Sequence, residues 1–252
     1  MTVDRLTIGI AAGVALAILS GCDAATTTDV APPTSPLAAT ALVPPLPDPS
    51  DFVPVITNPF VELIPGTTFV YRGETEEGVE TNTVEVTSDT KTILGISATV
   101  VHDIVYLDGV LAEDTFDWYA QDVSGNVWYL GEDTCEIENG ECVSKEGSWE
   151  AGVNGAEAGI LMWASPASVK GNAYRQELLQ GVAEDSAKVL RLDASVEVPY
   201  GSFSGCLETM EWSPLEPGVR EHKSYCPGTG LVLENQKRGG QIRMELVSIS
   251  RP

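Results

Sequence analysis

The sequence predicts an all-β protein in which two tandem repeats of a curved antiparallel meander, each shaped like half of a barrel, follow a signal peptide and a disordered linker. Three observations support this fold class. Runs of β-branched and aromatic residues alternate with turns that contain glycine and asparagine. The order of these turns recurs in the second half of the chain. A proline-rich stretch without hydrophobic periodicity separates both halves from an apolar N-terminus.

Residues 1–21 are expected to form a lipoprotein signal peptide. The apolar run from Leu6 to Leu19 fits an export signal and is too short to cross a bilayer comfortably as a helix. It ends in Leu19-Ser20-Gly21-Cys22, where small residues precede the cysteine. The resemblance to bacterial lipoproteins implies cleavage before Cys22 and a diacylglyceryl group, with chains such as palmitate, on that cysteine. A general secretory peptide that is cut elsewhere is the alternative.

Residues 22–57 are expected to form the lipidated cysteine and a linker rich in proline, alanine and threonine. This composition cannot bury a core, so we expect a semi-extended tether that holds the following domain away from the membrane. The protein would then be lipid-anchored in the cell envelope outside the cytoplasm, on either the inner or the outer membrane. The two β repeats are predicted at residues 58–163 and 164–252.

The charge balance excludes one class of partner. The chain has 14 basic and 37 acidic residues and a formal net charge of −23. A surface of this sign repels nucleic acid, so we expect no nucleic-acid partner. Solubility, or life in saline surroundings, is a simpler explanation for the acidity than calcium storage.

Five cysteines indicate two disulfides once Cys22 is lipidated, because an exported domain with four remaining cysteines typically pairs them. Three pairings are possible. We favour Cys135–Cys142, because Asn139-Gly140 between them is a hairpin turn signal. Cys206 and Cys226 would then join two other strands. Zinc binding is the alternative, but the spacing is wrong and the chain has only two histidines.

Six strand signals follow one another in the first repeat, separated by turns at Glu76-Glu77-Gly78, Asp108-Gly109 and residues 122–126. They lie at residues 67–71, 83–86, 95–105, 115–120, 127–130 and 148–150. The second repeat matches the first at offsets of 104 to 106 residues. The matched positions are Gly66–Phe69 with Gly171–Tyr174, Asp89 with Asp193, Gly95 with Gly201, Tyr119 with Tyr225, and Gly125–Val127 with Gly230–Val232. Residues 182–192 favour helix by propensity, but their counterpart is a strand, so we predict strand.

Several longer motifs carry a family resemblance. They are Asp114-Thr-Phe-Asp-Trp-Tyr-Ala-Gln-Asp122, Gly125-Asn-Val-Trp-Tyr129, Gly147-Ser-Trp-Glu-Ala-Gly-Val153, Tyr174-Arg-Gln-Glu177, Val198-Pro-Tyr-Gly-Ser-Phe203, and Glu211-Trp-Ser-Pro-Leu-Glu-Pro-Gly-Val219 with Glu221-His-Lys223. Residues 58–250 resemble an uncharacterised family of bacterial secreted proteins and lipoproteins. Each half also resembles, loosely, the half-barrels of periplasmic lipoprotein carriers. The resemblance implies a fold and an envelope location, and no activity.

No catalytic signature is present, so we expect no enzyme and no cofactor. Gly201-Ser-Phe-Ser-Gly205 has phenylalanine where a nucleophile elbow needs serine. His102 and Asp103 are adjacent in a predicted strand, so their side chains point to opposite faces. The charged residues Arg175, Glu177, Arg220, Glu221 and Lys223 are expected to form solvated cross-strand pairs.

Two weaker site candidates remain. Asp122, Ser124 and Asn126 resemble part of a calcium loop, although the strand that follows favours a hairpin turn and thus no metal. If calcium bound here, Glu132 and Asp133 would be the further carboxylates to examine.

Trp118, Tyr119, Trp128 and Tyr129 are core residues by default, but they could line a groove for an apolar ligand. We expect a non-catalytic binding module, for an apolar small molecule or in lipoprotein handling. A structural or protein-interaction domain that contacts an envelope protein is the alternative, and an envelope hydrolase is the least favoured.

Overall fold

The structure, a computed structural model, describes residues 42–240 and 242–252. One antiparallel sheet of 16 strands dominates it. The first run of the sheet contains β4 (Thr68–Thr75), β5 (Gly78–Ile93), β6 (Ile96–Leu107), β7 (Val110–Asp122), β8 (Val127–Glu138) and β11 (Glu157–Met162). The second run contains β12 (Ala173–Arg175), β14 (Ser186–Val198), β15 (Gly201–Trp212), β16 (Arg220–Cys226), β17 (Gly230–Arg238) and β18 (Arg243–Ser250). Strands that are neighbours in each run also follow one another along the chain, so each run is a meander.

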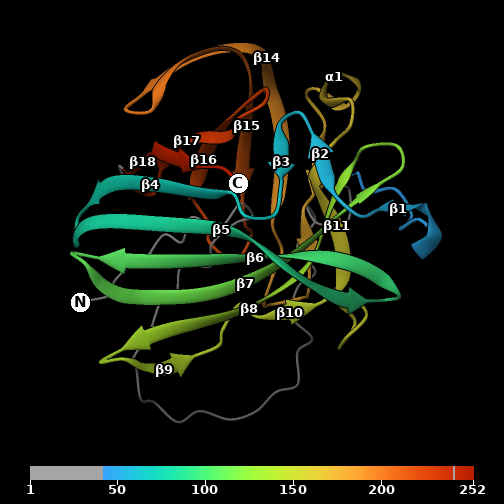
Figure 1. The fold of residues 1–252 in the computed structure, drawn as a ribbon, viewed down its shortest axis with the longest axis horizontal. Coiled ribbons are helices and arrows are strands. Elements are labelled where there is room, and N and C mark those ends of the chain that lie inside the picture. Colours follow the sequence, from blue (N-terminus) through green and yellow to red (C-terminus); the bar gives the residue numbers. More distant parts are fainter. Residues whose placement is uncertain (1–41, 241) are drawn as a thin grey trace.

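The two runs are joined at both ends. β18 pairs with β4, which links the end of the second run to the start of the first. On the other side, β12 is followed after Gln176 alone by β13 (Glu177–Leu178). β12 pairs with β14, whereas β13 pairs with β11. Because this nearly continuous strand has a partner on each side, the sheet curls into a nearly closed barrel (Figure 1). The predicted all-β fold class is confirmed.

Short elements complete the chain. They are the 3-10 helix η2 (Pro49–Asp51), the strands β1 (Phe52–Val53), β2 (Ile56–Asn58), β3 (Val61–Leu63), β9 (Glu141–Ser144) and β10 (Trp149–Glu150), and the helix α1 (Pro166–Val169). β9 and β10 pair with β8, and β1 pairs with β7. In the described part of the chain, no helix has the length and apolar character needed to cross a membrane.

The ladders show how the two runs correspond. A register shift immediately precedes Tyr119 in the β7–β8 pair and Tyr225 in the β16–β17 pair. Tyr119 lies opposite Tyr129, and Tyr225 lies opposite Leu231. The two tyrosines therefore occupy equivalent positions, as the sequence match predicted. The expected match of Gly230–Val232 to the first repeat is wrong in register, because the β16–β17 hairpin is four residues shorter between paired positions (129 − 119 against 231 − 225).

The ordered fold begins earlier than the sequence predicted. The linker was expected to run to residue 57, but Leu42 already donates a backbone hydrogen bond to Ala173 O at 2.9 Å. Residues 52–53 then pair with the end of β7. The proline content of this segment does not prevent order, because it packs on the barrel rather than forming a core of its own. The predicted signal peptide and Cys22 lie outside the described residues.

The β2–β3 hairpin lies between two turns of the barrel. Gln121 Oε1 accepts hydrogen bonds from the backbone N–H groups of Thr57 and Asn58, each at 2.8 Å. On the other side, Gly228 N–H donates to Pro59 O at 2.8 Å. The hairpin thus bridges the β7–β8 and β16–β17 turns, which are the corresponding turns of the two runs.

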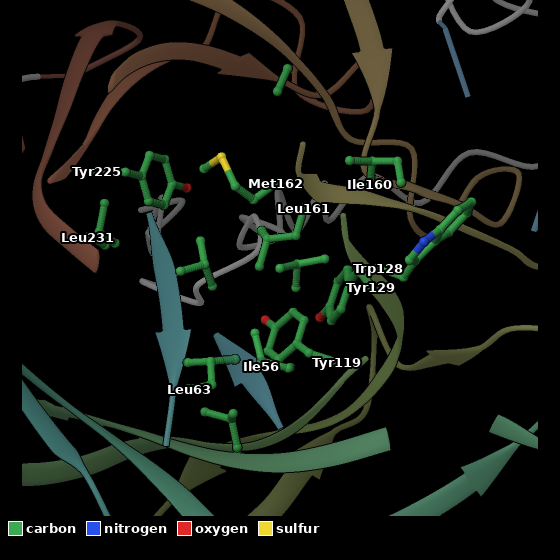
Figure 2. Packing of buried hydrophobic residues seen from close by; sticks show 14 of the residues in the cluster. Ile56, Leu63, Tyr119, Trp128, Tyr129, Ile160, Leu161, Met162, Tyr225 and Leu231 are labelled. Carbon is green, nitrogen blue, oxygen red and sulfur yellow. The ribbon is translucent and has the colours of Figure 1, made fainter. Parts of the chain in front are cut away.

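Apolar packing surrounds this hairpin. Figure 2 shows Ile56 and Leu63 of the hairpin pointing toward Tyr119, Leu161 and other side chains of the surrounding strands. Each of these four residues is at most 2% exposed. The hairpin therefore fills part of the barrel interior with apolar side chains, and the polar interior described next lies further along the strands.

Candidate functional site: the acidic interior

The structure contains both disulfides that the sequence predicted. Cys135–Cys142 joins β8 to β9, and Cys206–Cys226 joins β15 to β16. The second pair is almost fully buried, whereas Cys142 is exposed. Disulfides of this kind support an oxidising location outside the cytoplasm.

The four aromatic residues that could have lined an apolar groove are covered. Trp118, Tyr119, Trp128 and Tyr129 are between 0 and 6% exposed. Tyr119 and Tyr129 stack with ring centroids 4.8 Å apart. Lys91 Nζ lies 3.2 Å from the centroid of the Trp118 ring and covers it from outside. These side chains are packing residues in this structure, and they do not form an open groove.

The candidate calcium loop is a hydrogen-bonded turn. Asp122 accepts four hydrogen bonds, from Ser124 N–H at 2.8 Å, from the backbone and side chain of Asn126 at 3.0 and 2.9 Å, and from Trp128 Nε1 at 2.9 Å. Its carboxylate is therefore satisfied by protein donors. Within residues 42–240 and 242–252, no group of three or more histidine, cysteine or acidic side chains is arranged to hold a metal ion.

Both histidines contact carboxylates that the sequence did not point to. His102 Nε2 lies 2.6 Å from Asp114 Oδ1, and His222 Nδ1 lies 2.7 Å from Glu208 Oε1. Asp103, the sequence neighbour of His102, is buried on the opposite face as alternation predicts. Among the hydrogen bonds of the described residues, neither imidazole bonds to a hydroxyl or thiol, so the geometry contains no activated nucleophile of the Ser/His kind.

The main concentration of polar side chains lies inside the barrel. We call this set the acidic interior; each member is at most 9% exposed. Its members are Glu80, Asp103, Asp117, Glu132, Glu177, Asp185, Glu211, Glu221, Glu234 and Lys223. The expectation that Glu177, Glu221 and Lys223 form solvated surface pairs is wrong. A signal was present, because Glu221 and Lys223 alternate with Tyr225, a core aromatic, on the same face of one strand.

Lys223 is the cation of the acidic interior, and its side chain is completely buried. Its Nζ lies 3.4 Å from Glu211 Oε2, 3.4 Å from Glu234 Oε2 and 3.9 Å from Glu221 Oε2. Burial alone would lower the pKa of Lys223, but Glu234 and Glu211 outweigh it and hold that pKa well above its usual value. The ammonium group is therefore charged and compensates several carboxylates at once.

The opposite wall carries carboxylates without such a cation. Asp117 lies across from Glu132 in the β7–β8 ladder and accepts a hydrogen bond from Tyr129 OH at 2.7 Å. Burial raises the pKa of Asp117 to about 7, although the hydrogen bond from Tyr129 opposes the rise. Burial also raises the pKa of Glu80 to about 8. Part of the acidic interior is therefore protonated near neutral pH.

Two fully buried residues at the closing strand have polar atoms without hydrogen bonds. Gln176 Oε1 and Nε2 have no hydrogen-bond partner, and neither does Tyr174 OH. Both residues are at most 1% exposed. Burial, followed by the charge of Glu211, raises the pKa of Tyr174. Buried polar groups in folded proteins usually have a partner, so this corner has unused capacity for a polar one.

Comparison with known proteins identifies no family. No protein-family model matches the chain, and no curated protein matches it. Two solved structures are similar at low identity. One, from Parabacteroides distasonis, is provisionally described as a lipoprotein; it is 12% identical, with a TM-score of 0.42, over 76% of this chain and 98% of that one. The other, from Bacteroides fragilis, is provisionally described as an exported protein with a YmcC-like fold; it is 14% identical, with a TM-score of 0.43, over 75% of this chain and 97% of that one.

Proposed function

We propose that the chain is a lipid-anchored protein of the cell envelope that acts by binding, and that it binds a protein partner through the outer surface of its barrel. The envelope location is supported by the segment Leu19–Cys22 and by two disulfides in the folded domain. Either membrane is compatible with these observations.

We infer binding at the outer surface because the interior of the barrel is buried. The aromatic residues that could have bound an apolar ligand are packed, and the acidic interior is at most 9% exposed. The β2–β3 hairpin also bonds to turns of both runs. The surface that remains accessible to a partner is therefore the outer wall, which favours an interaction domain over an apolar-ligand carrier.

Metabolic labelling tests the anchor. Cells that express the full chain are grown with labelled palmitate, and the membrane fraction is compared with that of a Cys22→Ser variant. We expect label and membrane association for the natural chain, and neither for the variant. Cys142→Ser, which removes an exposed cysteine of the folded domain, is the matched control and should keep both. An unlabelled natural chain, or a Cys22→Ser protein that stays with the membranes, contradicts the anchor.

A second candidate function is binding of a polar small molecule inside the barrel. The unpaired atoms of Gln176 and Tyr174 favour it. Native mass spectrometry of the full chain, purified in detergent from its own membranes, would then show an added mass that is lost in a Tyr174→Phe, Gln176→Leu variant. Identical masses for both proteins, after correction for the substitutions, would eliminate this candidate.

A further inference from the structure

The outer side of two central strands carries a partly apolar surface, with the carboxylate of Asp114 directly opposite Ile104. We call this set the β6–β7 outer face; its residues are Val100, His102, Ile104, Tyr106, Leu111 and Phe116. All are half-buried except Phe116, which is 38% exposed. The alternating residues of β6 face the core, and Val101 and Asp103 are at most 1% exposed. The solvent-facing side of a sheet normally carries polar residues, whereas these positions carry mainly apolar ones.

The centre of this face is an ordered aromatic pair. His102 and Phe116 lie directly opposite each other in the β6–β7 ladder. Their rings stack with centroids 4.3 Å apart and planes within 9°. Asp114 Oδ1, 2.6 Å from His102 Nε2, holds the imidazole in this position. The face therefore presents a fixed, flat aromatic surface, which costs little conformational entropy when it is covered.

The surroundings of the aromatic pair are acidic. Glu85 is the cross-strand neighbour of His102, and Asp133 is the cross-strand neighbour of Phe116. Glu85 is exposed, and the Asp114 side chain is 38% exposed. One lysine, Lys145, pairs with Asp133 at 2.5 Å. The rim thus carries carboxylates on both sides of the apolar centre.

The corresponding face of the second run neutralises its own charge. There Glu208 contacts Arg191 Nε at 2.9 Å and His222 Nδ1 at 2.7 Å. The guanidinium of Arg220 lies 5.9 Å from the Trp212 ring centroid. Arginine side chains of the chain itself thus cover the acidic and aromatic groups on this side. On the β6–β7 outer face, Asp114 pairs with His102, and among the contacts of the described residues no lysine or arginine stacks on Phe116. Lysines lie at its edges, where Lys145 pairs with Asp133 and Lys91 covers Trp118.

From this contrast we infer that the β6–β7 outer face is the docking surface for a basic segment of a partner protein, with apolar side chains that cover Phe116 and Ile104 and lysine or arginine side chains that pair with the acidic rim. This inference rests on the proposed function and specifies its binding surface. Apolar centres with charged rims are typical of protein interfaces.

Binding of a defined peptide tests the inference. The probe is a fluorescent synthetic peptide of about twelve residues in which leucine alternates with lysine, long enough to cross several strands. Its affinity for the full chain in detergent is compared with that for a Phe116→Ser, Ile104→Thr variant. We expect the Kd to rise about tenfold in the variant, as truncation of interface anchors commonly does. A peptide with glutamate in place of lysine should not bind.

The matched control is a Met210→Thr, Trp212→Ser variant of the outer side of β15, which should change the Kd less than about twofold. Thermal melting confirms that both variants are folded. Equal weakening in both variants, or binding of the glutamate peptide, overturns the inference. So does a dimer of the natural chain in sedimentation that Phe116→Ser abolishes, because a second copy would then occupy the face, and so does flotation with phospholipid vesicles that Phe116→Ser removes. Palmitate labelling does not depend on peptide binding, so failure of the lipid anchor can be distinguished from failure of the docking surface.

Discussion

The two runs of the barrel place opposite charges at equivalent positions. Two residues before the equivalent tyrosines Tyr119 and Tyr225 lie Asp117 and Lys223. Asp117 faces Glu132 across its ladder, and Lys223 faces Glu234 across its own. One run therefore holds two carboxylates together, while the other holds an ion pair. Burial raises the pKa of Asp117 to about 7, and the charge of Lys223 offsets only a small part of this rise.

The same contrast extends to the whole of each repeat. Residues 58–163 contain 21 acidic and 3 basic residues, whereas residues 164–252 contain 11 acidic and 10 basic ones. The second repeat can thus satisfy its carboxylates internally, both around Lys223 and on its outer face. The first repeat has 3 basic residues for 21 acidic ones. At its surface, Glu150 pairs with Lys91, Asp133 with Lys145, and Glu157 with Arg175 of the second repeat. In its interior, burial raises the pKa of Asp117 and Glu80 instead.

Removal of the interior cation should have the largest effect. In a Lys223→Met variant, the carboxylates of Glu211 and Glu234 lose their buried counter-charge. Breaking such a pair by removing one partner costs about 3–5 kcal/mol. Urea unfolding at pH 7 measures the loss, with Lys188→Met, on the partly exposed side of β14, as the control. A loss below about 1 kcal/mol would show that the carboxylates take up protons without cost, as those of the first run do.

Loss of the disulfide in the second repeat should cost more stability than loss of the disulfide in the first repeat. Cys206–Cys226 spans 20 residues and is buried, whereas Cys135–Cys142 spans 7. Loop-closure entropy predicts that loss of the first costs about 3 kcal/mol and loss of the second about 2 kcal/mol. Double serine variants of each pair, compared by urea unfolding under oxidising conditions, measure the difference. Equal costs would contradict the loop-closure account, which alone predicts a difference of about 1 kcal/mol.

The carboxylate pair of the first run should make stability fall as the pH rises. The pKa of Asp117 is about 7 in the folded protein, and an unfolded aspartate titrates near pH 4. Between these values the folded state holds a proton that the unfolded state has released, so each rise in pH favours unfolding. The maximum slope is about 1.4 kcal/mol per pH unit for one group, and the loss is complete above the folded pKa.

Asp117→Asn removes this titration and should flatten the stability profile between pH 5 and 7 by about 1 kcal/mol per unit. Unfolding curves at several pH values measure it. Glu85→Gln, which replaces an exposed carboxylate of the same sheet, should leave the slope unchanged. A profile that stays as steep in Asp117→Asn as in the natural chain would place the protons elsewhere in the acidic interior, for example on Glu80.

The two runs of strands and the disulfides could be predicted from the sequence, but the charged residues inside the barrel could not. The hairpin signal Asn139-Gly140 led directly to one disulfide, and the recurrence of turns led to the two runs. Strand alternation correctly separated His102 from Asp103. These features depend on residues that are close in sequence.

The acidic interior depends on residues from many strands. Lys223 and Glu211 lie on the paired neighbouring strands β16 and β15, whereas Asp117 lies in the other repeat, and closure of the sheet encloses all three in one interior. Charged residues in alternating strands are usually solvated, so the sequence wrongly predicted that these side chains lie at the surface. The register of the β16–β17 hairpin was also predicted wrongly, because nothing in the local sequence indicates that it is four residues shorter than the β7–β8 hairpin.

The attachment of residue 42 has a mechanical consequence. Leu42 N–H donates to Ala173 O, and Arg175 N–H donates to Leu42 O at 3.4 Å. Both partners belong to β12, the strand that closes the sheet. Tension applied to the chain from its N-terminal side would therefore act first on this closing strand, which pairs with its neighbours over only a few residues on each side. A load on the N-terminal segment would thus be transmitted to one of the short pairings that close the barrel.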